Sequence, residues 1–207
     1  MARIYLQMLK NKEGNIIMSS FYSEKELEKI GFKSFGKNVL ISRNTCIYKA
    51  NEIEIGSNVR IDDFCFLLGK IVIGNYVHIA PFSNIVGGNE GVFFEDFSGV
   101  SSRVSIYAVS DDYSGVAMTN PTVPEKYTNV KSAKVVLEKH SIVGASSVIL
   151  PGVTLKEGTS CGSMSLITKS TDSWGIYVGI PAKRIAERKK ELLIIEKEFI
   201  NSDEYEV

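Results

Sequence analysis

The chain has 207 residues, a length that suits one domain with a sizeable hydrophobic core. Its 24 basic side chains balance 24 acidic ones, which argues against binding nucleic acid or an anionic membrane through net charge. No apolar run approaches the ~18–20 residues of a membrane-spanning helix, and residues 1–17 lack the features of a secretory signal. Met18 is an alternative natural start. The three cysteines form no CxxC pair, so we expect a reduced, cytoplasmic protein.

The first predicted element is a short helix over residues 23–30. Ser23 is a suitable N-cap, and Glu26 three residues later completes a capping box. Gly31 follows the helix as its stop signal. We expect this helix to cover the open end of the repeat that follows, where apolar surface and unpaired strand edges would otherwise be exposed.

A six-residue repeat begins near residue 35 and is most regular between residues 135 and 169. Each block opens with an aliphatic residue, an aromatic residue or a cysteine, and a small or apolar residue often lies two positions earlier. In an extended chain, residues two apart point to the same face, so each pair can enter one core. This pattern predicts an all-β fold, the parallel β-helix, because a β-sandwich would not keep a six-residue period across insertions. The strict openings are Leu137, Val143, Ile149, Leu155, Cys161 and Ile167, and the looser upstream ones are Phe35, Ile41, Ile47, Ile55, Ile61, Leu67, Ile73, Ile79, Ile85, Phe94, Val100 and Ile106.

Two segments depart from the repeat. Residues 107–134 interrupt it with prolines, glycine and mixed polar residues, and a segment of this length inside a compact domain is usually functional. We expect it to project as a loop. Beyond the repeat, a Gly-Ile-Pro turn precedes a predicted helix from about Ala182 to Phe199 that would form a second cap. The predicted parts are residues 1–34 (N-terminal extension and capping helix), 35–170 (β-helix) and 171–207 (C-terminal turn and helix).

Between about Phe21 and Phe199 the chain resembles the hexapeptide-repeat acyltransferases. The segments IGSNVRIDDFCFL, SSRVSIYAVSDDYSG, TNPTVPEKYTNV and GIPAKRI carry this likeness. They are similar to dTDP-4-amino-4,6-dideoxy-D-glucose acyltransferases, on the galactoside and maltose acetyltransferase branch. The resemblance implies a left-handed parallel β-helix, a homotrimer and acetyl-CoA as co-substrate, with no metal. It also implies a place in O-antigen or other surface-polysaccharide biosynthesis.

The resemblance further implies where the cofactor binds. In such enzymes acetyl-CoA lies in a groove between subunits, and backbone N–H groups of small corner residues receive the thioester oxygen. The motifs place Ala145 and Ser163 at these corners, and such a donor is commonly worth ~3–4 kcal/mol. A corner also needs small residues for steric reasons, so a purely structural role stays open. The residues that match the end receiving the nucleotide and phosphates of CoA are Thr168, Lys169, Lys183 and Arg184.

The chain departs from the family pattern at the expected general base. Galactoside-type enzymes carry a His in the projecting loop, where this chain has Asp111, followed by Asp112 and Tyr113 as candidate substrate contacts. An unperturbed Asp is a weaker base than His by ~2.6 pKa units. This difference matters less for an amine than for a hydroxyl, because a neutral amine already carries a nucleophilic lone pair. The departure therefore favours N-acylation, although the segment could also be a simple loop turn.

Two histidines and one asparagine complete the candidate site. His78 occupies an outward position of its hexad, where a general base, an acceptor contact and a plain surface residue are all consistent with the pattern. Asn84, also outward, is a candidate sugar contact. His140 fits a structural role or a position near the pantetheine of CoA.

The leading hypothesis is acetyl transfer from acetyl-CoA to the 4-amine of a nucleotide-linked sugar, dTDP-4-amino-4,6-dideoxy-D-glucose. The alternative is O-acetylation of a sugar or polysaccharide. A β-helical carbonic anhydrase would need three His ligands for zinc, and the chain has two histidines in all. A scaffold or ice-binding solenoid should show a row of repeated Thr, which the sequence lacks.

Overall fold

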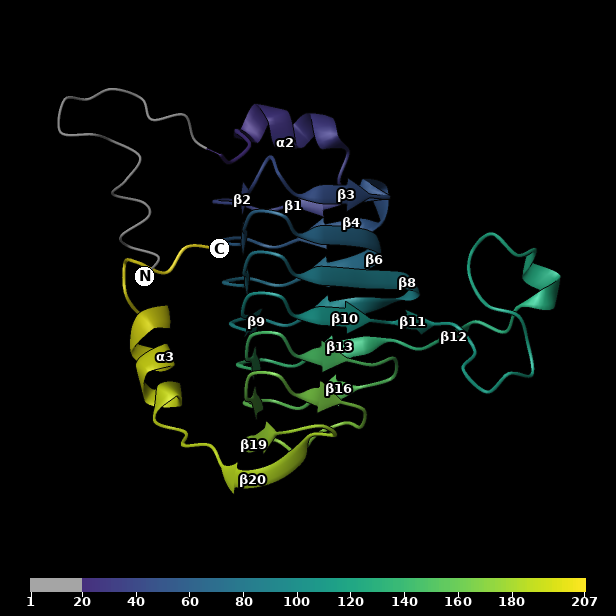
Figure 1. Ribbon diagram of the computed structural model, residues 1–207. Helices are drawn as coiled ribbons and strands as arrows, with labels where there is room; N and C mark the ends of the chain where they lie inside the picture. Colours follow the sequence, from purple (N-terminus) through teal and green to yellow (C-terminus); the bar gives the residue numbers. More distant parts are fainter. Residues whose placement is uncertain (1–19) are drawn as a thin grey trace.

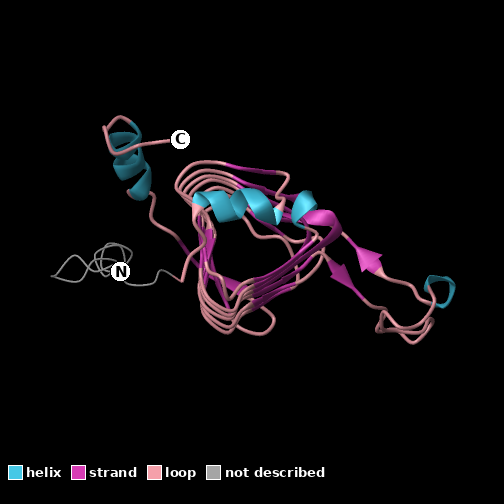
Figure 2. Cartoon of the chain, turned by 90° about the horizontal axis from the view of Figure 1, so that it is seen from above, coloured by secondary structure: helices cyan, strands magenta, loops and turns pink. Residues whose placement is uncertain are grey.

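The computed structural model describes residues 20–207, and the expectations for residues 1–17 and Met18 fall outside this range. Short parallel strands are stacked into a coil, seen from the side in Figure 1, with a triangular cross-section in Figure 2. The all-β parallel β-helix predicted from the hexads is therefore confirmed. Among the described residues, no helix is long and apolar enough to cross a membrane.

Two sheets form the three faces of this coil. The 8-stranded sheet is face A, and the 10-stranded sheet bends within its long strands β6 (Phe66–Ile73) and β8 (Asn84–Phe94) to form faces B and C. Face A contains β2 (Leu40–Ile41), β5 (Arg60–Ile61), β7 (His78–Ile79), β9 (Gly99–Val100), β14 (Ile142–Val143), β17 (Ser160–Cys161), β19 (Gly175–Val178) and β20 (Lys183–Glu187). Face B contains β3 (Cys46–Tyr48), the first parts of β6 and β8, β10 (Ser105–Tyr107), β15 (Val148–Ile149) and β18 (Leu166–Ile167). Face C contains β1 (Ser34–Phe35), β4 (Ile53–Ile55), the last parts of β6 and β8, β13 (Val135–Leu137) and β16 (Thr154–Leu155), and the 3-10 turn η1 (Ala50–Glu52) precedes β4.

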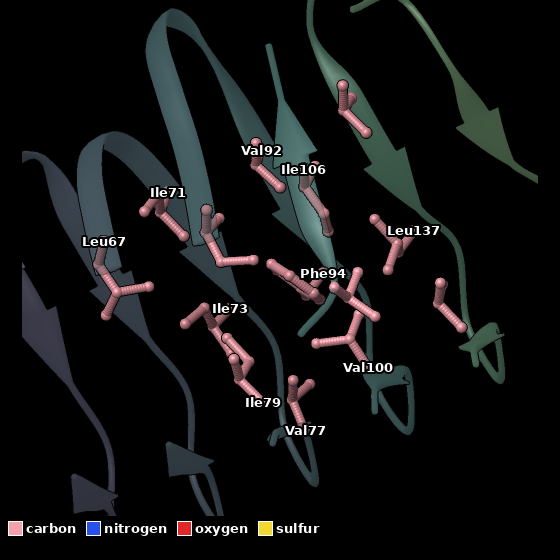
Figure 3. Packing of buried hydrophobic residues seen from close by; sticks show 14 of the residues in the cluster. Leu67, Ile71, Ile73, Val77, Ile79, Val92, Phe94, Val100, Ile106 and Leu137 are labelled. Atoms are coloured by element: carbon pink, nitrogen blue, oxygen red, sulfur yellow. The ribbon is translucent and has the colours of Figure 1, made fainter. Parts of the chain in front are cut away.

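The hexad openings fill the interior of the coil, as Figure 3 shows for its middle turns. From Ile41 to Ile167 every opening except Ile47 is at most 4% exposed. Full burial of such a side chain contributes about 1.5–3 kcal/mol. The small partners are buried as well, and their hydroxyls donate to nearby carbonyls: Ser83 to Ala80 at 2.8 Å and Ser165 to Gly162 at 2.8 Å. The core therefore accepts polar residues without leaving them unpaired.

The N-terminal cap is confirmed. Helix α2 (Glu24–Ile30) follows Ser23 as N-cap, and the Glu26 carboxylate accepts a hydrogen bond from the Ser23 N–H at 2.8 Å. The helix stops at Gly31, which takes the left-handed conformation with φ of 83°. Leu27 is 2% exposed and joins the core, so the helix covers the first coil, as Figure 1 shows.

The helix predicted from Ala182 is wrong at its start. Lys183–Glu187 instead form β20, which runs antiparallel to β19, and helix α3 begins only at Leu192 and ends at Ile200. The turn at residues 179–182 folds the chain back onto the last sheet edge, and β20 covers that edge, a protection that exposed strands need. Helix α3 lies beside the coil rather than across its end (Figure 1), where the Phe199 ring meets those of Tyr76 and Phe97.

The expected projecting loop leaves the coil after β10 and returns at β13. Strands β11 (Val109–Ser110) and β12 (Lys131–Ser132) pair antiparallel at its base, and the 3-10 turn η2 (Glu125–Tyr127) lies further out. Figure 1 shows the loop extending away from the body of the molecule. The loop therefore begins where face B ends, on a different side of the coil from face A.

Candidate active site

A histidine–carboxylate pair lies on the outer surface of face A. His78 starts β7, and its ring points away from the core because side chains alternate along a strand. The His78 Nε2 atom lies 2.7 Å from Oδ2 of Asp62, and Asp62 Oδ1 accepts a hydrogen bond from Arg60 Nε at 2.7 Å. The His78 side chain is 53% exposed and that of Asp62 only 12%. The carboxylate thus orients the imidazole and leaves Nδ1 as the nitrogen that can exchange a proton with a ligand.

The Asp62 carboxylate remains charged despite its burial. Burial alone would raise the pKa of Asp62, but the hydrogen bonds from His78 and Arg60 together outweigh it, so the pKa lies below its ordinary value. Asp62 is therefore an anion at neutral pH and would stabilise a proton arriving on His78.

Two adjoining hollows open around His78. The larger, of about 540 Å³, includes Asn58, Arg60 and Asp62 in its lining, and the smaller, of about 380 Å³, extends along face A to Ile142. Small-molecule sites commonly have volumes in this range. The residues that line both hollows are Tyr76, His78, Ala80 and Ser102.

The predicted oxyanion residues lie on the corner where face A turns into face B. Ala145 follows β14 and Ser163 follows β17, one coil further on, and the Ala145 carbonyl accepts a hydrogen bond from the Met164 N–H at 2.8 Å. Neither the Ala145 nor the Ser163 N–H donates a hydrogen bond to a partner within residues 20–207. Within the described part of the chain, both donors are therefore available to a ligand.

The predicted CoA-phosphate residues are exposed at the C-terminal end of the coil. Thr168 and Lys169 follow β18, at the end of face B. Lys183 and Arg184 lie in β20, where they face Val178 and Tyr177 in the register with β19. All four side chains are exposed, which fits a phosphate contact and a solvated surface equally well.

A third hollow lies at the base of the projecting loop. It has a volume of about 600 Å³, and its lining includes Asp111, Tyr113 and Tyr107. Asp112 does not face this hollow: its carboxylate is buried and accepts hydrogen bonds from the Ser114 hydroxyl, which holds the loop turn. Tyr113 is 92% exposed.

One copy of the chain does not bring all candidates together. His78 and the corner residues belong to face A and its edge, whereas Asp111 lies beyond face B. Asn84 points outward from face B, where its amide donates to the Ser105 hydroxyl at 3.4 Å. In a single copy, His78 is therefore separated from Asp111.

Comparison with known proteins places the chain in a family. Residues 52–87 match the model for bacterial transferase hexapeptide (six repeats). The chain is 45% identical over 183 residues to dTDP-4-amino-4,6-dideoxy-D-glucose acyltransferase from Escherichia coli, across 87% of this chain and 95% of that protein. The chain belongs to the hexapeptide-repeat acyltransferases.

The fold of this hexapeptide-repeat acyltransferase is similar to those of solved structures over most of its length. AntD, an N-acyltransferase from Bacillus cereus in complex with dTDP and 3-hydroxybutyryl-CoA, has a TM-score of 0.87 at 51% identity, covering 88% of this chain and 97% of AntD. A Ser-to-Cys variant of AntD, in complex with dTDP-4-amino-4,6-dideoxyglucose and CoA, also has a TM-score of 0.87, at 50% identity over 89% and 98% of the two chains. The expectation of an acyltransferase is confirmed.

Sequence reasoning missed two residues of the candidate site in this acyltransferase, Asp62 and Arg60. Arg60 is the register partner of His78, one full coil earlier, and Asp62 follows at the next corner. Three hexads make one coil, so residues three hexads apart lie on neighbouring strands of the same face. This spacing is visible in the sequence and relates Arg60 to His78.

Proposed function

We propose that this acyltransferase transfers an acetyl group from acetyl-CoA to the 4-amine of dTDP-4-amino-4,6-dideoxyglucose. The proposal is supported by the similarity to the Escherichia coli dTDP-4-amino-4,6-dideoxy-D-glucose acyltransferase and by the ligands bound to AntD. AntD also binds 3-hydroxybutyryl-CoA, so the acyl group is the least constrained part of the proposal. The protein would act in the cytoplasm, in the biosynthesis of O-antigen or another surface polysaccharide.

The observation that carries the chemistry is the His78–Asp62 pair beside two hollows. In the proposed mechanism the sugar amine attacks the thioester carbon, and the CoA sulfur leaves as a thiolate when the tetrahedral intermediate collapses. His78 accepts the proton that the amine nitrogen loses, while Asp62 holds the ring and stabilises the imidazolium. The free N–H groups of Ala145 and Ser163 would stabilise the oxyanion. Holding both substrates together supplies a further gain through proximity.

We further propose that the complete site is formed between two copies of the chain in a homotrimer. AntD structures carry substitutions of one aspartate and of a serine ten positions before it. Here Ser101 with Asp111, and Ser102 with Asp112, have the same spacing. The serines line the hollows around His78 and Asp111 lines the loop hollow, so a neighbouring copy would unite them.

The decisive experiment is mass spectrometry of the products from a panel of acyl-CoA donors and of dTDP- and UDP-linked aminosugars. We expect acetylation of the dTDP-4-amino sugar at its nitrogen. A product formed only from a different aminosugar would contradict the proposed acceptor, and transfer only from longer acyl-CoA would contradict the proposed donor.

O-acetylation stays a second candidate, because a histidine held by a carboxylate has the geometry to act as a general base towards a hydroxyl as well. The 4-hydroxy counterpart of the same nucleotide sugar separates the two reactions. N-acylation predicts that only the amine is acylated at an appreciable rate.

A further inference from the structure

The C-terminal strap, residues 202–207, follows helix α3 and lies along the corner where face C turns into face A. At this corner one residue of each coil takes a left-handed conformation, and aromatic rings stack outward along it. The Tyr76 and Phe97 rings are 5.1 Å apart and nearly parallel, and the Phe97 and His140 rings are 5.4 Å apart. Tyr76, at the N-terminal end of this stack, has φ of 57°.

Helix α3 and the strap together hold Tyr76 from three directions. The Phe199 ring meets that of Tyr76 edge-on at 5.2 Å, and the Tyr205 ring stacks on it at 5.4 Å and 18°. The Tyr76 hydroxyl donates to the Glu206 carbonyl and accepts from the Glu206 N–H, both at 2.9 Å. The amide of Asn58 also donates to the Glu206 carbonyl, at 2.5 Å.

Tyr76 and Asn58 are also walls of the candidate active site. Both line the larger hollow beside His78, and Tyr76 lines the smaller one too. The strap residues themselves line neither hollow. The strap therefore reaches the site only through the two side chains that it fixes.

Helix α3 has its own anchor, independent of the strap. Its Glu196 accepts a hydrogen bond from His140 Nε2 at 3.0 Å and forms an ion pair with Lys139. Just before the helix, Arg188 donates to the carbonyls of His140 at 2.7 Å and Gly158 at 3.0 Å. The last residues of the chain can thus be removed without releasing α3 from the coil.

We propose that the C-terminal strap is a positioning element that orders Tyr76 and Asn58 for binding of the nucleotide-sugar acceptor. The inference rests on the proposed function, since it takes the hollows around His78 as the acceptor site. Ordering a side chain before binding lowers the entropic cost of association, because the ligand then no longer has to immobilise that side chain. Loss of the strap should therefore weaken acceptor binding and leave acyl-CoA binding unchanged.

The test compares the full chain with a chain ending at Asn201 and with Tyr205→Ala and Tyr205→Phe. We expect the truncation to raise the acceptor KM about tenfold, with kcat and the acyl-CoA KM within twofold of the wild type. Tyr205→Ala should give a smaller rise, and Tyr205→Phe should restore the wild-type value because it keeps the ring stack. Asp203→Ala, an exposed change in the same segment, is the matched control.

A second readout keeps this inference separate from the proposed function. Calorimetric titration with dTDP alone measures nucleotide affinity without turnover. If the wild type acylates the amino sugar but truncation changes neither acceptor KM nor dTDP affinity by twofold, the strap proposal is overturned and the function stands. Equal loss of acceptor and acyl-CoA binding, or failure of Tyr205→Phe to rescue, would also overturn it, since either result indicates a general structural role.

Discussion

His78 and Asp62 meet because each coil of the β-helix repeats the position of the one before it. Arg60 and His78 face each other across β5 and β7, and Asp62 at the following corner completes the group. A surface histidine on an isolated strand would have no fixed orientation. Here the coil spacing supplies its orienting carboxylate without any special loop.

The first prediction concerns this pair and the loop aspartate. We expect His78→Ala to lower kcat by about 10²-fold, near the lower end of the usual general-base effect because an amine needs less assistance than a hydroxyl. Asp62→Asn should lower kcat less, because it removes the charge that orients His78 but leaves the imidazole in the site. Steady-state kinetics across pH 5–9 measure both effects, with Lys33→Ala on face C as a control.

Asp111→Asn belongs to the same series. If neither His78→Ala nor Asp111→Asn lowers kcat by even threefold, the assignment of a protein base is wrong. A large effect of Asp111→Asn alone would move the base to the projecting loop.

A second prediction concerns Gly144, at the corner beside Ala145. A Cβ atom there would lie 2.4 Å from the Ser163 nitrogen and 2.7 Å from the Gly162 carbonyl carbon, both backbone atoms of the next coil. Gly144→Ala should therefore cost about 1–3 kcal/mol in unfolding free energy through overpacking. Urea denaturation measures this loss.

Gly99→Ala is the matched control, because its nearest contact would be the His78 carbonyl oxygen at 3.1 Å. We expect a clearly smaller loss of stability there. Equal losses at both positions would show that corner packing is not what restricts residue 144.

At the scale of secondary-structure elements, the features predicted most accurately from the sequence are those set by local spacing. The hexad openings follow a fixed six-residue spacing, and the capping box at Ser23 is a short local motif. Both can be recognised in a single sequence. Residues 183–187 instead form a strand because they pair with the free edge of β19, and no local sequence motif indicates this pairing. Ile185, which falls within the helix predicted from Ala182 to Phe199, is 63% exposed on the covering strand.

The third prediction concerns helix α2 in acid. Hydrogen bonds from Arg43 first, and then from Ser23, lower the pKa of Glu26 from 4.5 to about 2. A group whose pKa is lowered in the folded state adds stability above its unfolded value, and this stability disappears as pH falls through the folded value. The contribution of Glu26 should thus be complete above about pH 4.5 and lost towards pH 2.

Thermal unfolding of the wild type and Glu26→Gln at several pH values tests this expectation. The wild type should have the higher Tm at pH 6, and the two should converge near pH 2. A difference in Tm that is the same at both pH values would show that the Glu26 charge contributes nothing to the cap.

At the scale of the whole molecule, the candidate site is divided between distant parts of one chain. The group around His78 belongs to face A, and Asp111 lies beyond face B. Contacts between copies lie outside what a pattern within one chain can predict. The expectation of a trimer accordingly rests on the family resemblance and not on the spacing of residues in one chain.

The fourth prediction follows from this division. If the site lies between copies, His78→Ala and Asp111→Asn each inactivate a different half of it. Mixed trimers formed by refolding or co-expressing the two variants should regain part of the wild-type kcat, because some interfaces then contain both intact halves. Light scattering checks the trimer, and an absence of any regained activity in confirmed mixed trimers would place each site within one copy.

The insertion of the projecting loop leaves the strands on either side of it in their ordinary alignment, with Ile106 of β10 opposite Ile149 and Leu137 of β13 opposite Leu155. A loop inserted at a corner of the coil thus leaves the hydrogen-bonded pairing of the neighbouring strands intact. Evolution could lengthen, shorten or exchange such a segment independently of the framework, and so retarget one stable enzyme to new acceptors without redesigning its interior.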